Sequence, residues 1–278
     1  MRARQSALIL VLLVCGAAAT LPPRLGAQAP SPAAAPVSAR TWIGHAAEIE
    51  NYLRTVPILK LQDLSVGVTH PRKATLPPGG PMQYLAWKVI PPARYEGFWE
   101  SYLSEIAAYE MDKLLELNMV PPTVEREYHS DRGAAVMWCS PTKSFKELGG
   151  KGAPEAPPAY AALWARQIAR AKMFDNLINN LDPNLGNWLV DPAWNLILID
   201  FSRCFTPGRN MEHELTRVDA DLWDRMKALT DASITQAIGK LIGTGERKAI
   251  LQRRDRMQEI IDKLVKERGA AYVFMRGG

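Results

Sequence analysis

Segment 174–205 holds three side chains whose types and spacing could support chemistry. Asp182 is followed five residues later by Asn187, and Asp200 closes a run of four apolar residues at 196–199. A carboxylate in a loop can accept the proton of a hydroxyl group. An amide and a second carboxylate at a strand end can hold a divalent cation against nucleotide phosphates, because Mg²⁺ prefers hard oxygen ligands. The pattern therefore fits phosphoryl transfer, with Asp182 at the acceptor and Asn187 and Asp200 at the metal.

A lysine upstream of this segment carries a charge that needs a partner. Lys88 lies inside the apolar stretch 84–90, where a charge is costly unless a phosphate or a carboxylate neutralises it. Glu105 follows 17 residues later, in a stretch (99–117) whose apolar residues recur at helical spacing. Lys88 is therefore a candidate for binding a phosphate or a carboxylate.

The whole set resembles the catalytic loop and metal-binding strand of the protein-kinase-like superfamily. It is most similar to the atypical branches, which share an N-x-D-x-x-x-x-N pattern followed by a hydrophobic strand that ends in aspartate. These branches include the secretory-pathway kinases, the HipA-type kinases and the type II phosphatidylinositol 4-kinases. The opening 180–182 (Asn-Leu-Asp) and the closing Asn187 match that pattern. The triplet 200–202 (Asp-Phe-Ser) takes the place of the Asp-Phe-Gly of ordinary protein kinases.

The resemblance assigns roles to the residues that match it. It implies that Lys88 forms an ion pair with Glu105 and positions the nucleotide phosphates, with Glu110 as the second candidate partner. It also implies that Met137, in a hinge at 136–138, contacts the adenine. Gly67 stands where the chain would pass over the phosphates. The implied cofactors are ATP and Mg²⁺ or Mn²⁺.

The chain also departs from the kinase pattern in three places. There is no G-x-G-x-x-G loop, and only the stretch 64–69 and the Gly79-Gly80 turn offer glycines near the expected phosphates. Pro183 replaces the arginine that often follows the loop aspartate in the atypical branches. No closing A-P-E motif follows Phe205, so the resemblance does not extend to a peptide-binding platform.

The expected elements divide around the Gly/Pro-rich passage 149–158. Before it we expect helices at 42–54 and 99–117 and strands at 61–68, 74–76, 82–90, 124–128 and 134–138. After it we expect a helix at 159–179, strands at 188–190 and 196–199, and helices from 220 to 268. The predicted class is α+β, a two-lobed protein-kinase-like fold with a small β-rich N-lobe (about 40–138) and a mainly helical C-lobe (about 139–278).

The N-terminus has the pattern of a secretory signal peptide. Arg2 and Arg4 precede an uncharged stretch (5–23), and the small-residue site Ala27-Gln28-Ala29 follows. We therefore expect cleavage near Ala29, a Pro/Ala-rich linker at 30–39, a kinase-like domain at 40–278, and an extracytoplasmic protein, periplasmic or secreted. The alternative is an uncleaved anchor, and only in that case is a membrane association expected.

The composition excludes some classes of function. Apolar residues make up 47% of the chain and charged residues 23%, which argues against a disordered protein. The net charge of +5 falls to +2 once the first 29 residues are set aside, because they hold three arginines and no acid. This balance argues against a nucleic-acid-binding protein, in which a basic excess is expected.

Motifs for other chemistries are missing from the sequence. The four histidines are scattered, with no H-E-x-x-H pair for zinc, and there is neither a G-x-S-x-G elbow nor a Walker loop. Cys139 and Cys204 are too few for a disulfide scaffold, and whether they pair is left open. Asp175 is interpreted as a brace for the Asp182 loop, and the charged run 253–256 as a solvated helix face.

These observations together favour a secreted, kinase-like ATP-dependent phosphotransferase acting on a hydroxyl group. The acceptor is open among a protein, a glycan, a lipid headgroup and a small molecule. One alternative is a non-catalytic pseudokinase that acts as a nucleotide-sensing or interaction scaffold. Another is a nucleotidyltransferase, because the same fold can present ATP the other way round.

Overall fold

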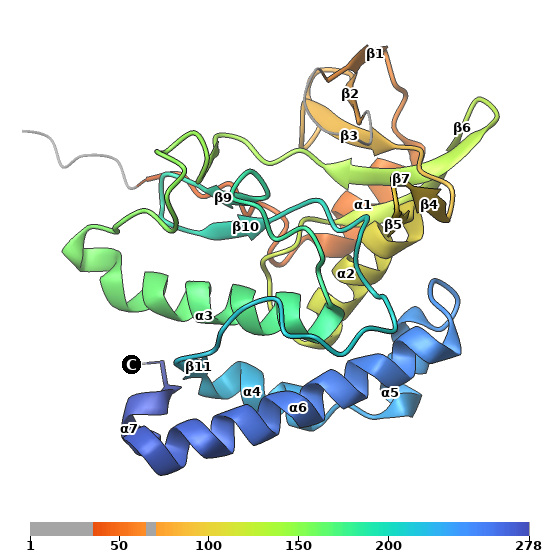
Figure 1. Ribbon diagram of the computed structural model, residues 1–278. Coiled ribbons are helices and arrows are strands. Elements are labelled where there is room, and N and C mark those ends of the chain that lie inside the picture. The colour runs from red at the N-terminus through yellow and green to blue at the C-terminus, as the bar shows by residue number, and fades with distance from the viewer. Residues whose placement is uncertain (1–35, 65–70, 278) are drawn as a thin grey trace, which may run out of the picture. The chain divides into compact units, whose positions relative to one another are not determined.

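The computed structural model describes residues 36–64 and 71–277. The chain from Pro36 onward forms one compact unit, with a β-sheet in its N-terminal part and mainly helices in its C-terminal part (Figure 1). This arrangement confirms the predicted α+β class. The predicted signal peptide (1–29), most of the linker (30–39) and Gly67 lie outside the described residues.

The N-terminal part is built on a five-stranded antiparallel sheet in the order β1-β2-β3-β7-β6. Its strands are Lys60–Asp63 (β1), Arg72–Thr75 (β2), Tyr84–Lys88 (β3), Thr123–Tyr128 (β6) and Asp131–Met137 (β7). Successive side chains of a strand point to opposite faces. Leu85 and Trp87 therefore share one face, where they pack in the same apolar cluster as Leu53 of α1 (Ala46–Thr55). Lys88 lies on the other face of β3.

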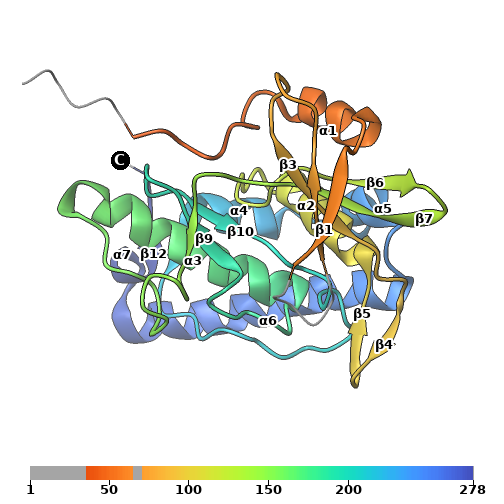
Figure 2. The same ribbon diagram turned by 90° about the horizontal axis from the view of Figure 1, so that it is seen from above.

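A hairpin between β3 and the next helix was not predicted. The sequence analysis placed the start of a helix at residue 99, whereas β4 (Ala93–Tyr95) and β5 (Phe98–Glu100) pair as an antiparallel hairpin. Its two-residue turn has positive φ angles of 49° at Glu96 and 90° at Gly97, the conformation that matches the twist of a tight hairpin. The hairpin projects from the body of the molecule (Figure 2).

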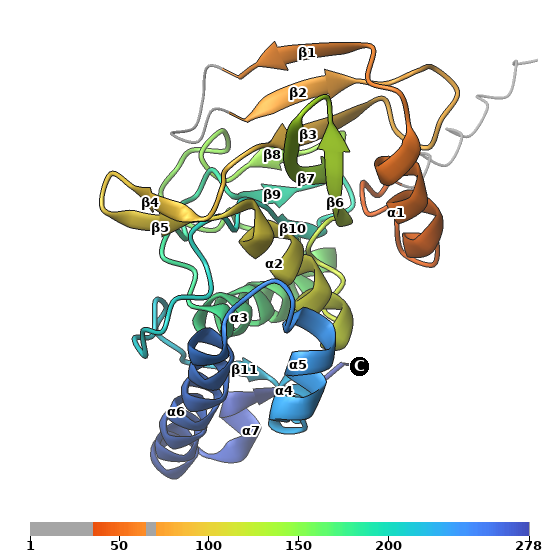
Figure 3. The ribbon, with the colours of Figure 1, turned by 90° about the vertical axis from the view of Figure 1, so that its right-hand side faces the viewer.

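Helix α2 (Tyr102–Leu114) begins directly after this hairpin. The hydroxyl group of Ser101 accepts the backbone N–H of Leu103 at 3.0 Å and caps the helix. The helix lies between the sheet and the C-terminal helices, in contact with β6 and β7 on one side and α5 on the other (Figure 3). Glu105, in the first turn, is therefore buried.

The C-terminal part is mainly helical, as predicted. It comprises η1 (Pro158–Tyr160), α3 (Ala161–Ile178), α4 (Ala220–Lys227), α5 (Asp231–Ile238), α6 (Thr244–Arg268) and α7 (Ala270–Val273). One small sheet holds β8 (Lys143–Ser144), β9 (Trp188–Val190) and β10 (Leu196–Leu198), and another pairs β11 (Val218–Asp219) with β12 (Phe274–Met275). In the part of the chain that the structure describes, no helix combines the length and the apolar character needed to span a bilayer.

The sequence interpretation of segment 253–256 as a solvated face is wrong for Arg253. This side chain is fully buried, and its guanidinium donates to the backbone carbonyl groups of Leu177, Thr206 and Gly208 at 2.6–3.0 Å. The reason lies in the helix period, because Arg253 falls on the same face of α6 as the buried Ile250 and Met257. The arginine thereby joins α6 to the end of α3 and to the segment after Asp200.

We expect Arg253→Leu to lower the free energy of unfolding by about 2–4 kcal/mol, because it leaves three buried carbonyl groups without a charged donor. The matched control is Arg256→Leu on the same helix, whose arginine is exposed and pairs with Glu259. This control should change stability by less than about 0.5 kcal/mol. Urea unfolding of both variants measures the difference, and equal effects would contradict the structural role of Arg253.

Candidate active site

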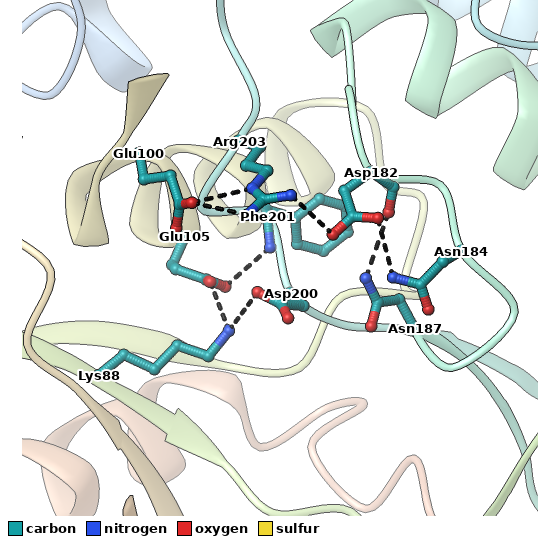
Figure 4. Close-up of polar contacts among 9 residues, drawn as sticks. All are labelled: Lys88, Glu100, Glu105, Asp182, Asn184, Asn187, Asp200, Phe201 and Arg203. Atoms are coloured by element: carbon teal, nitrogen blue, oxygen red, sulfur yellow. Dashed lines mark hydrogen bonds and ion pairs between the residues drawn. The ribbon is translucent and has the colours of Figure 1, made fainter. Parts of the chain in front are cut away.

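The buried ammonium of Lys88 lies between the carboxylates of Glu105, which is buried, and Asp200, which is partly exposed (Figure 4). Its Nζ atom is 2.5 Å from Oε1 of Glu105 and 2.8 Å from Oδ1 of Asp200. The predicted ion pair with Glu105 is thus present, whereas Glu110 pairs with Lys113 at 2.9 Å. Lys88 and Glu105 are only 6% and 2% exposed, so neither charge can be neutralised by water alone.

The charges of this group are mutually dependent. Burial lowers the pKa of the Lys88 ammonium, but the carboxylates of Asp200 and Glu105 outweigh burial, and the net direction is upward. Burial raises the pKa of Asp200, yet the charge of Lys88 outweighs it and the net direction is downward. Burial raises the pKa of Glu105, against the opposing charge of Lys88. At neutral pH the site therefore presents a protonated lysine and an ionised Asp200.

Helix α2 is hydrogen-bonded to the segment that follows Asp200. The second carboxylate oxygen of Glu105 accepts the backbone N–H of Phe201 at 3.1 Å. Two further bonds join the segments: the N–H of Ser101 to the carbonyl of Ser202 at 3.0 Å, and the hydroxyl of Ser104 to the carbonyl of Cys204 at 3.4 Å. Asp200 itself has a φ of 65°, which is uncommon for a residue with a side chain. The bonds on either side hold this conformation, which turns its carboxylate toward Lys88.

The loop after α3 holds Asp182 through its own asparagines. The side-chain oxygen of Asn180 accepts the N–H of Asp182 at 3.1 Å, and the amide of Asn184 donates to Oδ1 of Asp182 at 3.0 Å. The amide of Asn187 donates to the carbonyl of Asp182 at 3.3 Å. The Asp182 side chain is 37% exposed, so it is held in place and still open to an incoming hydroxyl group.

Asp175 braces this loop, in agreement with the sequence interpretation. It is fully buried, and its Oδ1 accepts the amide of Asn180 at 3.0 Å. Its backbone carbonyl accepts the N–H of Asn180 at 2.9 Å, and Nε2 of His213 lies 3.0 Å from Oδ2. Its contacts are therefore structural, with none toward the exposed Asp182 side chain.

The β9–β10 pairing brings the two predicted metal ligands together. Trp188 lies opposite Leu198, and the N–H of Ile199 donates to the carbonyl of Asn187 at 3.0 Å, so Asp200 follows directly beside it. Because Nδ2 of Asn187 donates to the loop, its amide oxygen is the atom left for a cation. One amide oxygen and one ionised carboxylate fit Mg²⁺ or Mn²⁺, which take their other ligands from phosphate and water. Within residues 36–64 and 71–277 no cluster of three or more His, Cys, Asp or Glu side chains offers a competing metal site.

Met137 is placed differently from the other predicted residues. Its side chain packs in the apolar cluster with Leu85 and Trp87, on the face of the sheet opposite to Lys88. Its backbone N–H donates to the carbonyl of Pro122 at 2.9 Å, and its own carbonyl accepts the thiol of Cys139 at 3.9 Å. The structure therefore does not bring the Met137 side chain to the charged group.

Two residues that the sequence analysis missed complete the site. Arg203 donates through Nε and Nη2 to Oε1 of Glu100, at 2.9 and 2.8 Å, and its Nη1 lies 3.6 Å from Oδ2 of Asp182 (Figure 4). Arg203 could have been noticed as a cation three residues after Asp200. Glu100 could not, because its position depends on the hairpin that the sequence analysis did not predict.

Comparisons with known proteins identify the fold. No protein-family model and no curated protein match this chain. The structure of hydra Fam20 with sugar is similar, with a TM-score of 0.63 and 14% identity, over 83% of this chain and 92% of that one. The Golgi casein kinase with Mn/ADP bound is also similar, with a TM-score of 0.61 and 13% identity, over 84% of this chain and 79% of that one. Identities this low bear on the fold alone.

Proposed function

Because this chain has the protein-kinase-like fold predicted from its sequence, we propose that it is an ATP-dependent phosphotransferase that works outside the cytoplasm. It would transfer the γ-phosphoryl group of ATP to a hydroxyl group of an acceptor, with Mg²⁺ or Mn²⁺ as the metal. The neighbour with Mn/ADP bound supports a nucleotide and a divalent cation as ligands.

One observation carries this proposal: the ammonium of Lys88 contacts the carboxylates of both Glu105 and Asp200. These residues come from β3, α2 and the end of the β9–β10 pair, and they meet within 2.8 Å. A buried lysine between two carboxylates is costly as a purely structural device. The arrangement becomes useful if Lys88 also binds phosphate oxygens, since the two carboxylates then hold its ammonium in place.

The chain's own residues would act mainly by positioning. Lys88, held by Glu105, would contact the nucleotide phosphates, and Asp182 would accept the proton of the attacking hydroxyl group. A divalent cation bound by Asn187 and Asp200 would neutralise the charge of the phosphates. Little covalent chemistry is then asked of the protein, in keeping with phosphoryl transfer in general.

The proposal specifies the acceptor only as a compound that carries a hydroxyl group. The two neighbours are named for a sugar ligand and for casein kinase activity. A protein, a glycan, a lipid headgroup and a small molecule are therefore the acceptor classes to test. No nucleic-acid partner is proposed.

Incubation with labelled ATP tests the proposal directly. The mature protein would be mixed with Mg²⁺ or Mn²⁺, a panel of acceptors, and ATP labelled either at the γ- or at the α-phosphate. Phosphoryl transfer moves only the γ label to the acceptor, whereas nucleotidyl transfer moves the α label. Nucleotide binding with no transfer of either label would favour the pseudokinase instead.

Nucleotide binding should depend on the metal. We expect ATP at a hundredfold excess over its dissociation constant to stabilise the protein by about 2.7 kcal/mol. For a chain of this size that corresponds to a rise in melting temperature of about 5–10 °C. The rise should vanish when EDTA removes the divalent cation and should persist in Asp224→Ala, which removes an exposed aspartate of α4. A rise that is unaffected by EDTA would contradict the metal role of Asn187 and Asp200.

We also propose that the first 29 residues are removed on export, as the sequence pattern predicts. The expected product begins at Pro30 and is recovered outside the cytoplasm, which mass spectrometry of the N-terminal peptide measures. A product that begins at Met1 and fractionates with membranes would instead indicate an uncleaved anchor.

A further inference from the structure

Arg203 is fixed far more firmly than a surface arginine. Two of its nitrogens, Nε and Nη2, donate to the same oxygen of Glu100 at 2.9 and 2.8 Å. Glu100 is only 1% exposed, and the Arg203 side chain is 15% exposed. The ring of Phe98 lies against the guanidinium, with its centroid 4.6 Å from Cζ. Both holding residues belong to β5, so the hairpin sets the plane of the guanidinium.

The third nitrogen of this guanidinium is directed at the catalytic loop. Nη1 of Arg203 lies 3.6 Å from Oδ2 of Asp182, and the amide of Asn184 donates to Oδ1 from another direction at 3.0 Å. At 3.6 Å the arginine acts through its charge rather than through a short hydrogen bond. Both oxygens of the Asp182 carboxylate are therefore flanked by a donor or a cation.

A purely structural role for Arg203 would not require its third nitrogen to lie beside Asp182. A cation that only neutralises Glu100 could use any two of its nitrogens and could leave the third in solvent. The rigid fork of arginine instead places the remaining nitrogen beside the one carboxylate of the loop that is open to an acceptor. If the carboxylate is already fixed when the acceptor binds, its rotational entropy does not have to be lost during the reaction.

We propose that Arg203, held by Glu100 and Phe98, is a positioning residue that orients the carboxylate of Asp182 toward the acceptor hydroxyl. This inference rests on the proposed phosphotransferase function. It joins the β4–β5 hairpin to the catalytic loop, so the hairpin becomes part of the active site.

The expected signature is a split between turnover and nucleotide binding. A misplaced catalytic group costs on the order of 10²-fold in rate, so Arg203→Ala should lower kcat by about that factor. The KM for ATP should change by less than about threefold, because Lys88 and Asp200 keep their contacts. Millimolar guanidinium chloride should restore part of the kcat of Arg203→Ala, since it can occupy the space beside Glu100, whereas ammonium chloride should not.

Two further variants keep the test independent of folding. Glu100→Gln combined with Arg203→Gln removes both charges together, leaves no unpaired buried ion, and should show the same loss of kcat. The matched control is Arg166→Ala. Arg166 is also a partly exposed arginine that pairs with a buried carboxylate, Asp219, at 2.7 Å, but in the helical part. It should leave kcat within about twofold of the parent protein.

The experiment measures γ-phosphate release to water as well as transfer to acceptors, together with backbone amide exchange of segment 182–187 in the ligand-free protein. If the parent protein turns over ATP and Arg203→Ala matches Arg166→Ala, the positioning role is wrong and the proposed function stands. If the parent protein releases no phosphate to water or to any acceptor, the proposed function fails, and amide exchange decides the positioning role. Faster exchange of segment 182–187 in Arg203→Ala and in the double variant, but not in Arg166→Ala, supports it, and unchanged exchange overturns it.

Discussion

Asp182→Asn is expected to lower turnover by about 10²–10⁴-fold, the contribution of a positioned acid–base group. Asparagine has the same size as aspartate and keeps one oxygen, so it can still accept the amide of Asn184. It cannot accept the proton of an attacking hydroxyl group. The affinity for ATP should stay nearly unchanged, because no contact of Lys88 or Asp200 involves this side chain. Steady-state kinetics with γ-labelled ATP measures the first quantity, and equilibrium binding the second.

The contrasting variant is Asp200→Ala, which should lose metal-dependent nucleotide binding as well as turnover. The two variants therefore separate a proton acceptor from a metal ligand. Full activity in Asp182→Asn would show that the catalytic loop is assigned wrongly, whatever the role of Asp200. If the parent protein and Asp182→Asn both bind ATP and are equally inactive on every acceptor, the pseudokinase alternative is favoured.

Lys88→Ala is expected to lower the free energy of unfolding by about 3–5 kcal/mol, because it removes the only cation that contacts the buried Glu105 in the described part of the chain. Nucleotide binding should weaken as well, since the phosphates lose the Lys88 ammonium. The matched control is Lys113→Ala. Lys113 also contacts two carboxylates at 2.9 Å, those of Glu50 and Glu110, but its side chain is 36% exposed. This control should cost less than about 1 kcal/mol.

The loss in Lys88→Ala should also depend on pH. Burial raises the pKa of Glu105, and without Lys88 the hydrogen bond from the backbone N–H of Phe201 is left to oppose that rise. A carboxyl group whose pKa is higher in the folded state than in the unfolded state binds its proton more readily when folded, so stability falls as the pH rises through that interval. The stability deficit should therefore shrink when unfolding is measured under acidic conditions. A deficit that stays constant between pH 8 and pH 5 would contradict this account of Glu105. A difference of one pKa unit between the folded and unfolded states corresponds to roughly 1.4 kcal/mol in the free energy of unfolding.

Most of the candidate site could be predicted from local patterns. Lys88 stands out because a charge in an apolar strand needs a partner, and Asp182, Asn187 and Asp200 follow from a spacing that one loop and one strand pair can impose. For these residues the information lies within a few positions along the chain, where propensity and period act. Glu105 is singled out instead by the resemblance to the kinase-like superfamily.

One residue was misjudged although its local pattern was sufficient, and one contact could not be predicted because it joins distant segments. Arg253 was read as exposed, although the spacing of Ile250 and Met257 already puts it on the buried face of α6. The adenine contact of Met137, in the hinge 136–138, stays a prediction, and its side chain faces the α1 side of the sheet. The contact between Glu100 and Arg203 joins residues 103 positions apart and needs the hairpin to be in place. No local sequence pattern indicates a contact between residues so far apart in the chain.

The hydrogen bonds between residues 100–105 and 201–204 have a consequence for how the site would come apart. They join the first turn of α2 to the segment after Asp200 at three points. A shift of α2 that moves Glu105 away from Lys88 would have to break these bonds as well. Loss of the Lys88–Glu105 pair and release of the segment beside Asp200 would then be one event rather than two.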